Sequence, residues 1–138
     1  MTTILDYIHE SEITLLNILA NSMKITNDFV NFFKSQKIEE IVIVGSGTSC
    51  HAGRVVKPLF EKTLNIRTSA LYPNEFIEQI SFYPSNTLVI GVSQSGTSTS
   101  TYNALKSAKK NNMYTMSLTT FPNAKIATNV DFNILLDC

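Results

Sequence analysis

Five short β-rich runs, separated by segments of helical length, constrain the fold of this 138-residue chain more than any other feature. Such alternation is typical of βαβ units, in which a helix crosses between two parallel strands. The first, third and fourth runs are nearly continuously hydrophobic, as expected for strands that helices cover on both faces. The strands are expected at residues 41–45, 66–71, 87–93, 113–119 and 132–136. We therefore predict an α/β fold built on a parallel sheet.

The segment before the first strand carries apolar side chains at helical spacing over residues 3–36. Thr3 with Asp6 three positions later forms a capping-box pattern, which predicts that a helix begins there. We expect an N-terminal helical lead-in over residues 1–37 and one α/β domain over residues 38–138. An α/β domain seldom ends on a strand that no helix covers, so we also expect the N-terminal part of a longer protein with two such domains.

Composition excludes several classes of function. Eleven basic residues balance eleven acidic ones, so the chain offers no basic face for nucleic-acid phosphates. It has neither an apolar run of about 18 residues, as a membrane helix needs, nor the pattern of a signal peptide. Cys50 and Cys138 are too few for a disulfide framework, and with His9 and His51 they make no convincing zinc site. We expect a cytoplasmic protein without metal or organic cofactor and without nucleic-acid or membrane partners.

A loop of small residues follows each of two predicted strands, at residues 45–49 and at residues 93–98. Both loops contain the tripeptide Gly-Thr-Ser. Glycine lets the backbone approach a ligand closely, and the N-terminus of the following helix offers unpaired N–H groups and the positive end of its dipole. A phosphate monoester would fit such a site.

The two loops are expected to face each other. In a doubly wound, flavodoxin-like sheet of order 2-1-3-4-5, strands 1 and 3 are neighbours and their helices leave on opposite faces, which opens a crevice between the loops. Seven of the nine residues from 93 to 101 are hydroxylic, a surplus that a polyhydroxylated, phosphorylated ligand would use. The alternative is ordinary turn chemistry, because Ser and Thr are common N-caps and Gly is common in tight turns.

Other motifs and single residues give weaker indications. Cys50 interrupts a dinucleotide fingerprint, Ser95 stands where a nucleophile elbow needs glycine, and no P-loop motif is present. Cys50 is expected to be a small buried residue and His51 a partly buried, hydrogen-bonded one, although either could react near a ligand. Glu75 is expected to interact with the dipole of its own helix, the alternative being a general base.

Two segments together resemble the SIS (sugar isomerase) domain family. They are IVIVGSGTS at residues 41–49 and LVIGVSQSG at residues 88–96, of which Ser-Gln-Ser-Gly is the most specific part. The similarity is strongest to the first half of the isomerase part of glucosamine-6-phosphate synthase and to AgaS-like relatives. It implies a three-layer αβα sandwich with a five-stranded parallel sheet that binds phosphosugars.

The resemblance also implies roles for particular residues. Ser93, Gln94, Ser95 and Ser98 would hold the phosphate, and Thr48 and Ser49 would line the same site. The synthase pattern continues with Glu where this chain has Thr97, which leaves the identity of the sugar open. The complete expected substrate site consists of Gly47, Thr48, Ser49, Ser93, Gln94, Ser95, Gly96 and Ser98.

The catalytic residues of two-domain family members lie downstream of the matching region, so none is assigned here. We expect the substrate-binding half of a sugar-phosphate ketose/aldose isomerase or of an amino-sugar-phosphate deaminase/isomerase, acting on a phosphorylated sugar or amino sugar. The alternatives are a non-catalytic sugar-phosphate sensor of a regulator and a scaffold that binds nothing. The exposed surface of the last strand and of the helices favours a homodimer.

Overall fold

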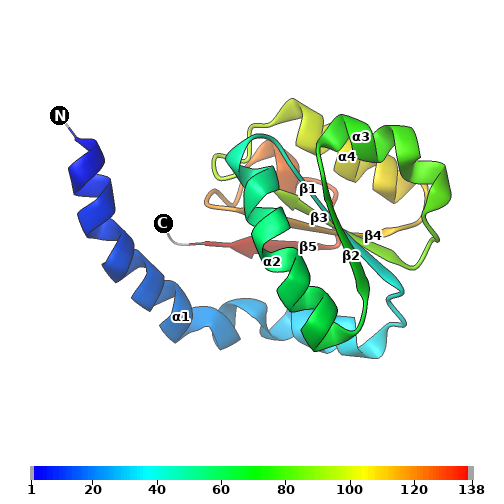
Figure 1. Cartoon of the computed structure of the whole chain (residues 1–138), viewed down its shortest axis with the longest axis horizontal. Helices are drawn as coiled ribbons and strands as arrows, with labels where there is room; N and C mark the ends of the chain where they lie inside the picture. The colour runs from blue at the N-terminus through cyan, green and yellow to red at the C-terminus, as the bar shows by residue number, and fades with distance from the viewer. Residues whose placement is uncertain (1, 137–138) are drawn as a thin grey trace.

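A single parallel sheet with helices on both faces forms the body of the protein (Figure 1), and the computed structural model describes residues 2–136. The strand order is β2-β1-β3-β4-β5, and every pairing is parallel. The strands are β1 (Glu40–Gly45), β2 (Arg67–Leu71), β3 (Thr87–Val92), β4 (Tyr114–Thr119) and β5 (Phe132–Leu135). The predicted doubly wound sheet is confirmed, and each strand lies within one residue of its expected bounds. Cys138 lies outside the described residues.

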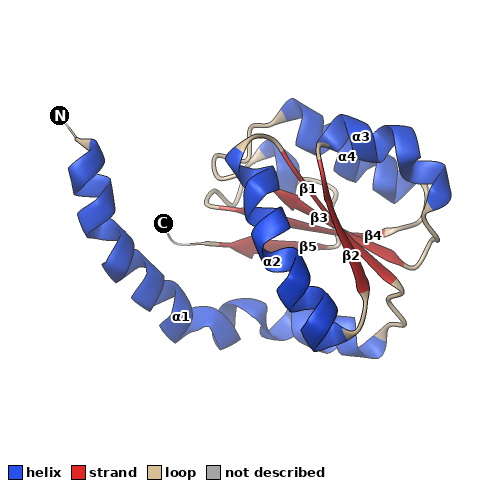
Figure 2. Ribbon diagram, in the orientation of Figure 1, coloured by secondary structure: helices blue, strands red, loops and turns tan. Residues whose placement is uncertain are grey.

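Helices cover the sheet in two layers (Figure 2), which completes the αβα sandwich. The helices are α1 (Ile4–Ser35), α2 (Thr48–Leu64), α3 (Pro73–Gln79) and α4 (Thr99–Lys110), with short 3-10 helices η1 (Ile80–Phe82) and η2 (Lys125–Ala127). One core packs α3, α4 and η2 against one sheet face, and the other packs α2 and the C-terminal part of α1 against the opposite face. Alternate residues of β1 show the division, since Val42 and Val44 enter the first core and Ile41 and Ile43 the second.

The lead-in is one continuous helix of 32 residues, α1. Its predicted capping box is present, because Thr3 Oγ1 accepts a hydrogen bond from the N–H of Asp6 (3.3 Å) and the Asp6 carboxylate accepts one from the N–H of Thr3 (2.6 Å). Residues 4–23, which we call the arm, extend away from the body in Figure 1. No helix of the described chain is long and apolar enough to cross a membrane.

An aromatic cluster holds the C-terminal part of α1 on the sheet edge. Phe132 of β5 packs against Phe29 and Phe32, with ring centroids 5.6 and 4.6 Å apart. Tyr114 of β4 packs edge-on against Phe32 at 5.3 Å, and its hydroxyl donates a hydrogen bond to the Gln36 side chain (2.9 Å). The position of α1 therefore depends on contacts between residues about 80 to 100 positions apart.

Gly96 docks the loop that follows β3 against the connection from β4 to η2. Its φ of +68° lies in the left-handed region. Its carbonyl accepts a hydrogen bond from the N–H of Ile126 (3.0 Å), and its N–H donates to the carbonyl of Ser93 (3.1 Å). A Cβ at this position would lie 2.2 Å from Ala124 Cβ and 2.7 Å from Thr119 Oγ1. Only glycine satisfies both the backbone conformation and the packing.

The first prediction concerns this contact. Gly96→Ala is expected to lower the free energy of unfolding by about 3 kcal/mol, because it combines left-handed strain with overpacking. A second change, Ala124→Gly, removes the atom that a Cβ at position 96 would overlap most closely. The double variant should therefore lose less stability than the two single variants lose in sum. Urea unfolding of all four proteins measures this, and strictly additive losses would contradict the packing explanation.

Asp131 joins the start of β5 to β4 through one carboxylate. Its Oδ2 accepts hydrogen bonds from the N–H (2.8 Å) and the hydroxyl (3.0 Å) of Thr115, and its Oδ1 accepts one from Lys109. Burial by itself raises the pKa of Asp131, but the hydrogen bonds from Lys109 and Thr115 outweigh burial and hold the pKa below its ordinary value. The charged form therefore stabilises the fold.

The second prediction follows from the lowered pKa. Asp131→Asn should reduce the free energy of unfolding at pH 7 by about 1–2 kcal/mol, since it weakens charged hydrogen bonds at a partly exposed site. The carboxylate contributes fully above its unfolded pKa of about 3.9 and loses this contribution as pH falls through the lower folded pKa. Urea unfolding should show the two proteins converging below about pH 4. The control is Asp28→Asn, on the exposed surface of α1, which should change stability little at any pH. If the stability loss of Asp131→Asn were the same at every pH, it would not come from the charge of the carboxylate.

Candidate functional site

The two small-residue loops lie side by side at the carboxyl end of the sheet. β1 and β3 are hydrogen-bonded neighbours, and their last residues, Gly45 and Val92, are register partners. The hydroxyl oxygens of Ser46 and Ser100 lie 3.2 Å apart, so the loop after β1 contacts the first turn of α4. The juxtaposition expected at the point where the strand order reverses is therefore present.

The first loop turns directly from β1 into α2. Gly47 is the N-cap of α2, with a φ of +55° that favours glycine. A Cβ on Gly47 would have no atom within 4 Å, so its backbone faces open space. Thr48 is exposed and Ser49 half-buried at the start of α2. This loop therefore offers open backbone and two hydroxyls at a helix N-terminus.

The second loop is held more tightly. Ser93 is 8% exposed, and its N–H donates to the carbonyl of Leu118 (3.1 Å). Gln94 and Ser95 are exposed, and the Ser95 and Thr97 hydroxyl oxygens are 2.8 Å apart. Within residues 2–136, neither the N–H of Gln94 nor that of Ser95 has a hydrogen-bond acceptor. The loop thus has two backbone donors without an acceptor in the described part of the chain.

Ser98 acts as a helix N-cap, the role that the alternative interpretation of this loop predicts. It is the N-cap of α4, and its Oγ accepts a hydrogen bond from the N–H of Thr101 (3.3 Å). The same hydroxyl donates to Thr101 Oγ1 (2.9 Å). Binding a ligand through this hydroxyl would therefore require Ser98 to share or exchange these contacts.

A cavity of about 290 Å³ opens where the two loops meet. Of the eight expected site residues, Thr48, Ser49 and Gln94 lie on its wall. Its other lining residues are Ala52, Val92, Leu118, Thr119, Thr120 and Leu136. Gly47, Ser93, Ser95, Gly96 and Ser98 belong to the same loops but do not line it. The cavity is therefore a mainly apolar pocket with a polar wall from both loops.

A larger hollow of about 590 Å³ adjoins this cavity, because Thr120 and Leu136 line both. It lies between the end of β5 and α1, whose polar residues Asn17, Asn21 and Lys24 form part of its wall. The contribution of α1 at the edge of the site was not anticipated from sequence. These residues lie far from both loops along the chain, so spacing within a motif could not reveal it.

The electrostatics of the two helix N-termini suit an anion. Neither α2 nor α4 has an acidic residue in its first turn, so no carboxylate neutralises the positive dipole end. Lys125 of η2 adds positive charge beside α4, with its Nζ 3.1 Å from Thr99 Oγ1 and 5.2 Å from the centroid of the Tyr102 ring. Sequence reasoning missed Lys125, which reaches α4 only through the docking of η2.

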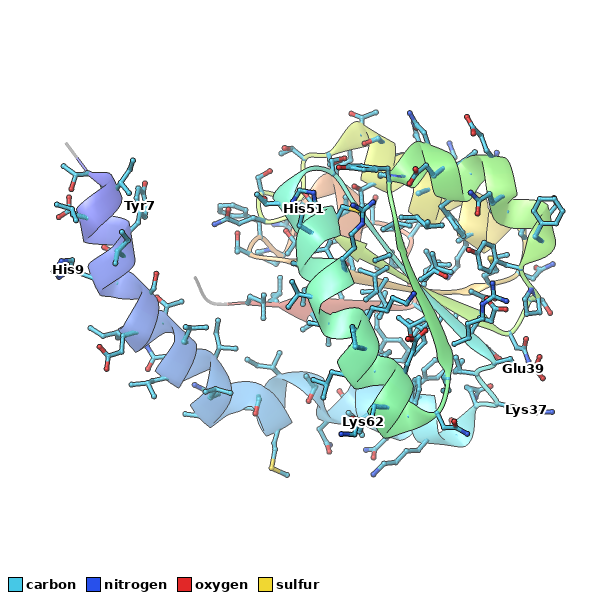
Figure 3. All side chains as sticks on the ribbon, in the orientation of Figure 1. Tyr7, His9, Lys37, Glu39, His51 and Lys62 are labelled. Atoms are coloured by element: carbon cyan, nitrogen blue, oxygen red, sulfur yellow. The ribbon has the colours of Figure 1, made fainter. Side chains whose placement is uncertain are left out.

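The single residues singled out from sequence behave differently from one another. Cys50 is completely buried, as expected. His51 is exposed at the start of α2 (Figure 3), so the prediction of a partly buried His51 was wrong: its side chain points away from the sheet. Glu75 accepts a hydrogen bond from the N–H of Tyr72 (2.9 Å), which is the N-cap of α3. Its interaction with its own helix terminus is thus confirmed. In the described part of the chain, no three His, Cys, Asp or Glu side chains cluster as metal ligands.

Comparison with known proteins agrees with this architecture. The sequence profile of the SIS domain matches residues 34–137. A glutamine–fructose-6-phosphate aminotransferase (isomerizing) from Aquifex aeolicus is 33% identical over 102 residues, which cover 74% of this chain and 17% of that protein. This chain thus spans about a sixth of that relative's length.

Two solved structures are similar in fold and sequence. A Clostridium difficile protein assigned as a phosphosugar isomerase is 35% identical with a TM-score of 0.86, over 96% of this chain and 37% of that one. The C-terminal domain of glucosamine-fructose-6-phosphate aminotransferase from Francisella tularensis is 27% identical with a TM-score of 0.67, over 72% of this chain and 28% of that one. With the profile match over most of its length, this chain belongs to the SIS domain family and is related to phosphosugar isomerases.

Proposed function

We propose that this chain binds the phosphate group of a phosphorylated sugar or amino sugar at residues 93–98. It would serve as the substrate-binding half of a sugar-phosphate ketose/aldose isomerase or of an amino-sugar-phosphate deaminase/isomerase. The observation that carries the proposal is the pairing of two hydroxyl-rich loops, each at a helix N-terminus that no acidic side chain neutralises. The relationship to phosphosugar isomerases supports the same substrate class.

The phosphate would be bound mainly by neutral donors. The candidate donors are the N–H groups of Gln94 and Ser95, the Ser95 hydroxyl and the first turn of α4, all of which belong to the second loop or directly follow it. Hydrogen bonds to a charged oxygen are about twice as strong as neutral ones, so a few such donors can hold a phosphate dianion. Lys125 would add long-range attraction from beside Thr99.

The sugar would extend from the phosphate into the cavity between the loops. Thr48, Ser49 and Gln94 on the cavity wall can exchange hydrogen bonds with sugar hydroxyls, and the apolar part of the wall can contact the carbon skeleton. A volume of about 290 Å³ accommodates one monosaccharide better than an oligosaccharide.

We assign substrate binding to residues 2–136 and assign no catalytic base among them. Aldose–ketose isomerisation moves a proton between C1 and C2, which requires a general base within hydrogen-bond reach. Within residues 2–136, the residues that line the cavity include no carboxylate and no imidazole. Anchoring the remote phosphate would still contribute to rate, because it holds the reacting carbons in one orientation. The cytoplasmic location and the homodimer stay predictions.

The third prediction tests the phosphate site by thermal unfolding with hexose and hexosamine 6-phosphates. A ligand at one hundred times its Kd stabilises the native state by about 2.7 kcal/mol, which should raise Tm by roughly 8 °C. The matching unphosphorylated sugars should give no shift, and inorganic phosphate should compete. Ser95→Ala should weaken binding roughly ten- to hundredfold, because it removes one charge-assisted hydrogen bond.

The matched control is Ser81→Ala, an exposed serine of η1 just before β3 and therefore at the opposite, amino end of the sheet. It should bind the sugar phosphates as the unaltered chain does. The proposal fails if no phosphosugar raises Tm, if free sugars act equally, or if Ser95→Ala leaves the shift unchanged.

A further inference from the structure

Neither of the two small-residue loops carries an ionisable side chain. Residues 45–49 and 93–98 consist of Gly, Ser, Thr and Gln alone. The first turns of α2 and α4 likewise contain no acidic residue. The proposed phosphate site therefore has neutral donors and the dipole ends of two helices, so a fixed positive charge has to come from another element.

Lys125 of η2 supplies such a charge beside the second loop. Its Nζ lies 3.1 Å from Oγ1 of Thr99, the first residue of α4, and 5.2 Å from the centroid of the Tyr102 ring. Among the Lys and Arg side chains of residues 2–136, Lys125 alone has a hydrogen bond or salt bridge to either loop or to the first turn of α4. No carboxylate of the same residues forms a salt bridge with it.

The backbone of Lys125 is fixed against the second loop on both sides. Ala124 is 7% exposed and lies against Gly96, and Ile126 is completely buried. The N–H of Ile126 donates a hydrogen bond to the carbonyl of Gly96 (3.0 Å). Two buried neighbours and this hydrogen bond hold η2 in place, so the lysine side chain starts from a fixed position when it reaches the first turn of α4.

The position of this ammonium group is unfavourable in the unliganded chain. Cations stabilise the C-terminal end of a helix dipole and are repelled by its N-terminal end. α4 follows this rule at its C-terminus, where Lys109 and Lys110 stand in the last turn. Lys125 lies at the opposite end, and the Tyr102 ring compensates only part of the repulsion. An anion bound at this turn would remove the repulsion, because it would interact favourably with both the lysine and the helix dipole.

We infer that Lys125 makes the proposed site specific for a doubly charged phosphate group, an inference that rests on the proposed phosphate binding at residues 93–98. Neutral donors bind any tetrahedral oxyanion, whereas a unit positive charge attracts a dianion more strongly than a monoanion. A phosphate monoester carries two negative charges above its second pKa of about 6, and a sulfate ester of the same shape carries one. Lys125 would therefore select sugar 6-phosphates over the corresponding 6-sulfates.

The fourth prediction compares the two esters of glucose and of glucosamine, glucose 6-phosphate with glucose 6-sulfate and glucosamine 6-phosphate with glucosamine 6-sulfate. Calorimetric titration at about pH 8 and low salt keeps the phosphate doubly charged, the lysine protonated and the charges little screened. The unaltered chain should bind a phosphate more tightly than its matching sulfate. Lys125→Gln should reduce this preference about five- to tenfold, because it removes one unit charge from a partly exposed site. Lys125→Arg keeps the charge and should retain the preference.

Lys110→Gln is the matched control, since it removes the same charge from the opposite end of α4. It should leave the preference for phosphate unchanged. The Tm of each unliganded variant checks the fold, because a merely structural lysine would lower Tm and weaken binding of both esters equally.

Three results would overturn the role of Lys125 while leaving phosphate binding itself in place. They are equal affinity of the unaltered chain for phosphate and sulfate, equal weakening of both esters by Lys125→Gln, and an unchanged preference in that variant. If the unaltered chain bound none of the four esters, the proposed function and this inference would fail together.

Discussion

β1 and β3 lie side by side in the sheet although α2, β2 and α3 separate them along the chain, and this parallel pairing organises the molecule. Both strands are buried on both faces, so each must be followed by a helix that covers one face. α2 covers one face and α4 the other, which leaves their N-termini on either side of the line where the strands end. The crevice follows from strand order alone.

The candidate site uses the same backbone features that close the two loops. Gly47 makes an open turn, whereas Gly96 makes a turn packed against Ala124 and Thr119. Ser98 caps α4, whose positive dipole end lies at the loop. Docking of η2 both holds the second loop and brings Lys125 beside α4, so the folding of this loop and the proposed phosphate binding would depend on the same contact.

α1 has two parts with different environments. Its C-terminal part is fixed by the aromatic cluster around Phe132, whereas within residues 2–136 the side-chain hydrogen bonds of its N-terminal part, including the capping box, are all local. Tertiary packing usually stabilises a long helix more than intrinsic propensity does. The arm therefore exposes an apolar face that no other element within residues 2–136 covers.

The sequence by itself determined the strands, their order, the capping box of α1 and the two loops, because these depend on local periodicity and on the rules of parallel sheets. Only the tertiary structure decided four other features. They are the exposure of His51, the role of Tyr72 as the N-cap of α3, the position of Lys125 beside α4, and the place of Asn17 and Asn21 in the wall of the larger hollow. The exposure of the arm was also decided only by the tertiary structure. A helical pattern records which side of a helix is apolar, but not what lies against it, since that contact is made by residues distant in the chain or by a second chain.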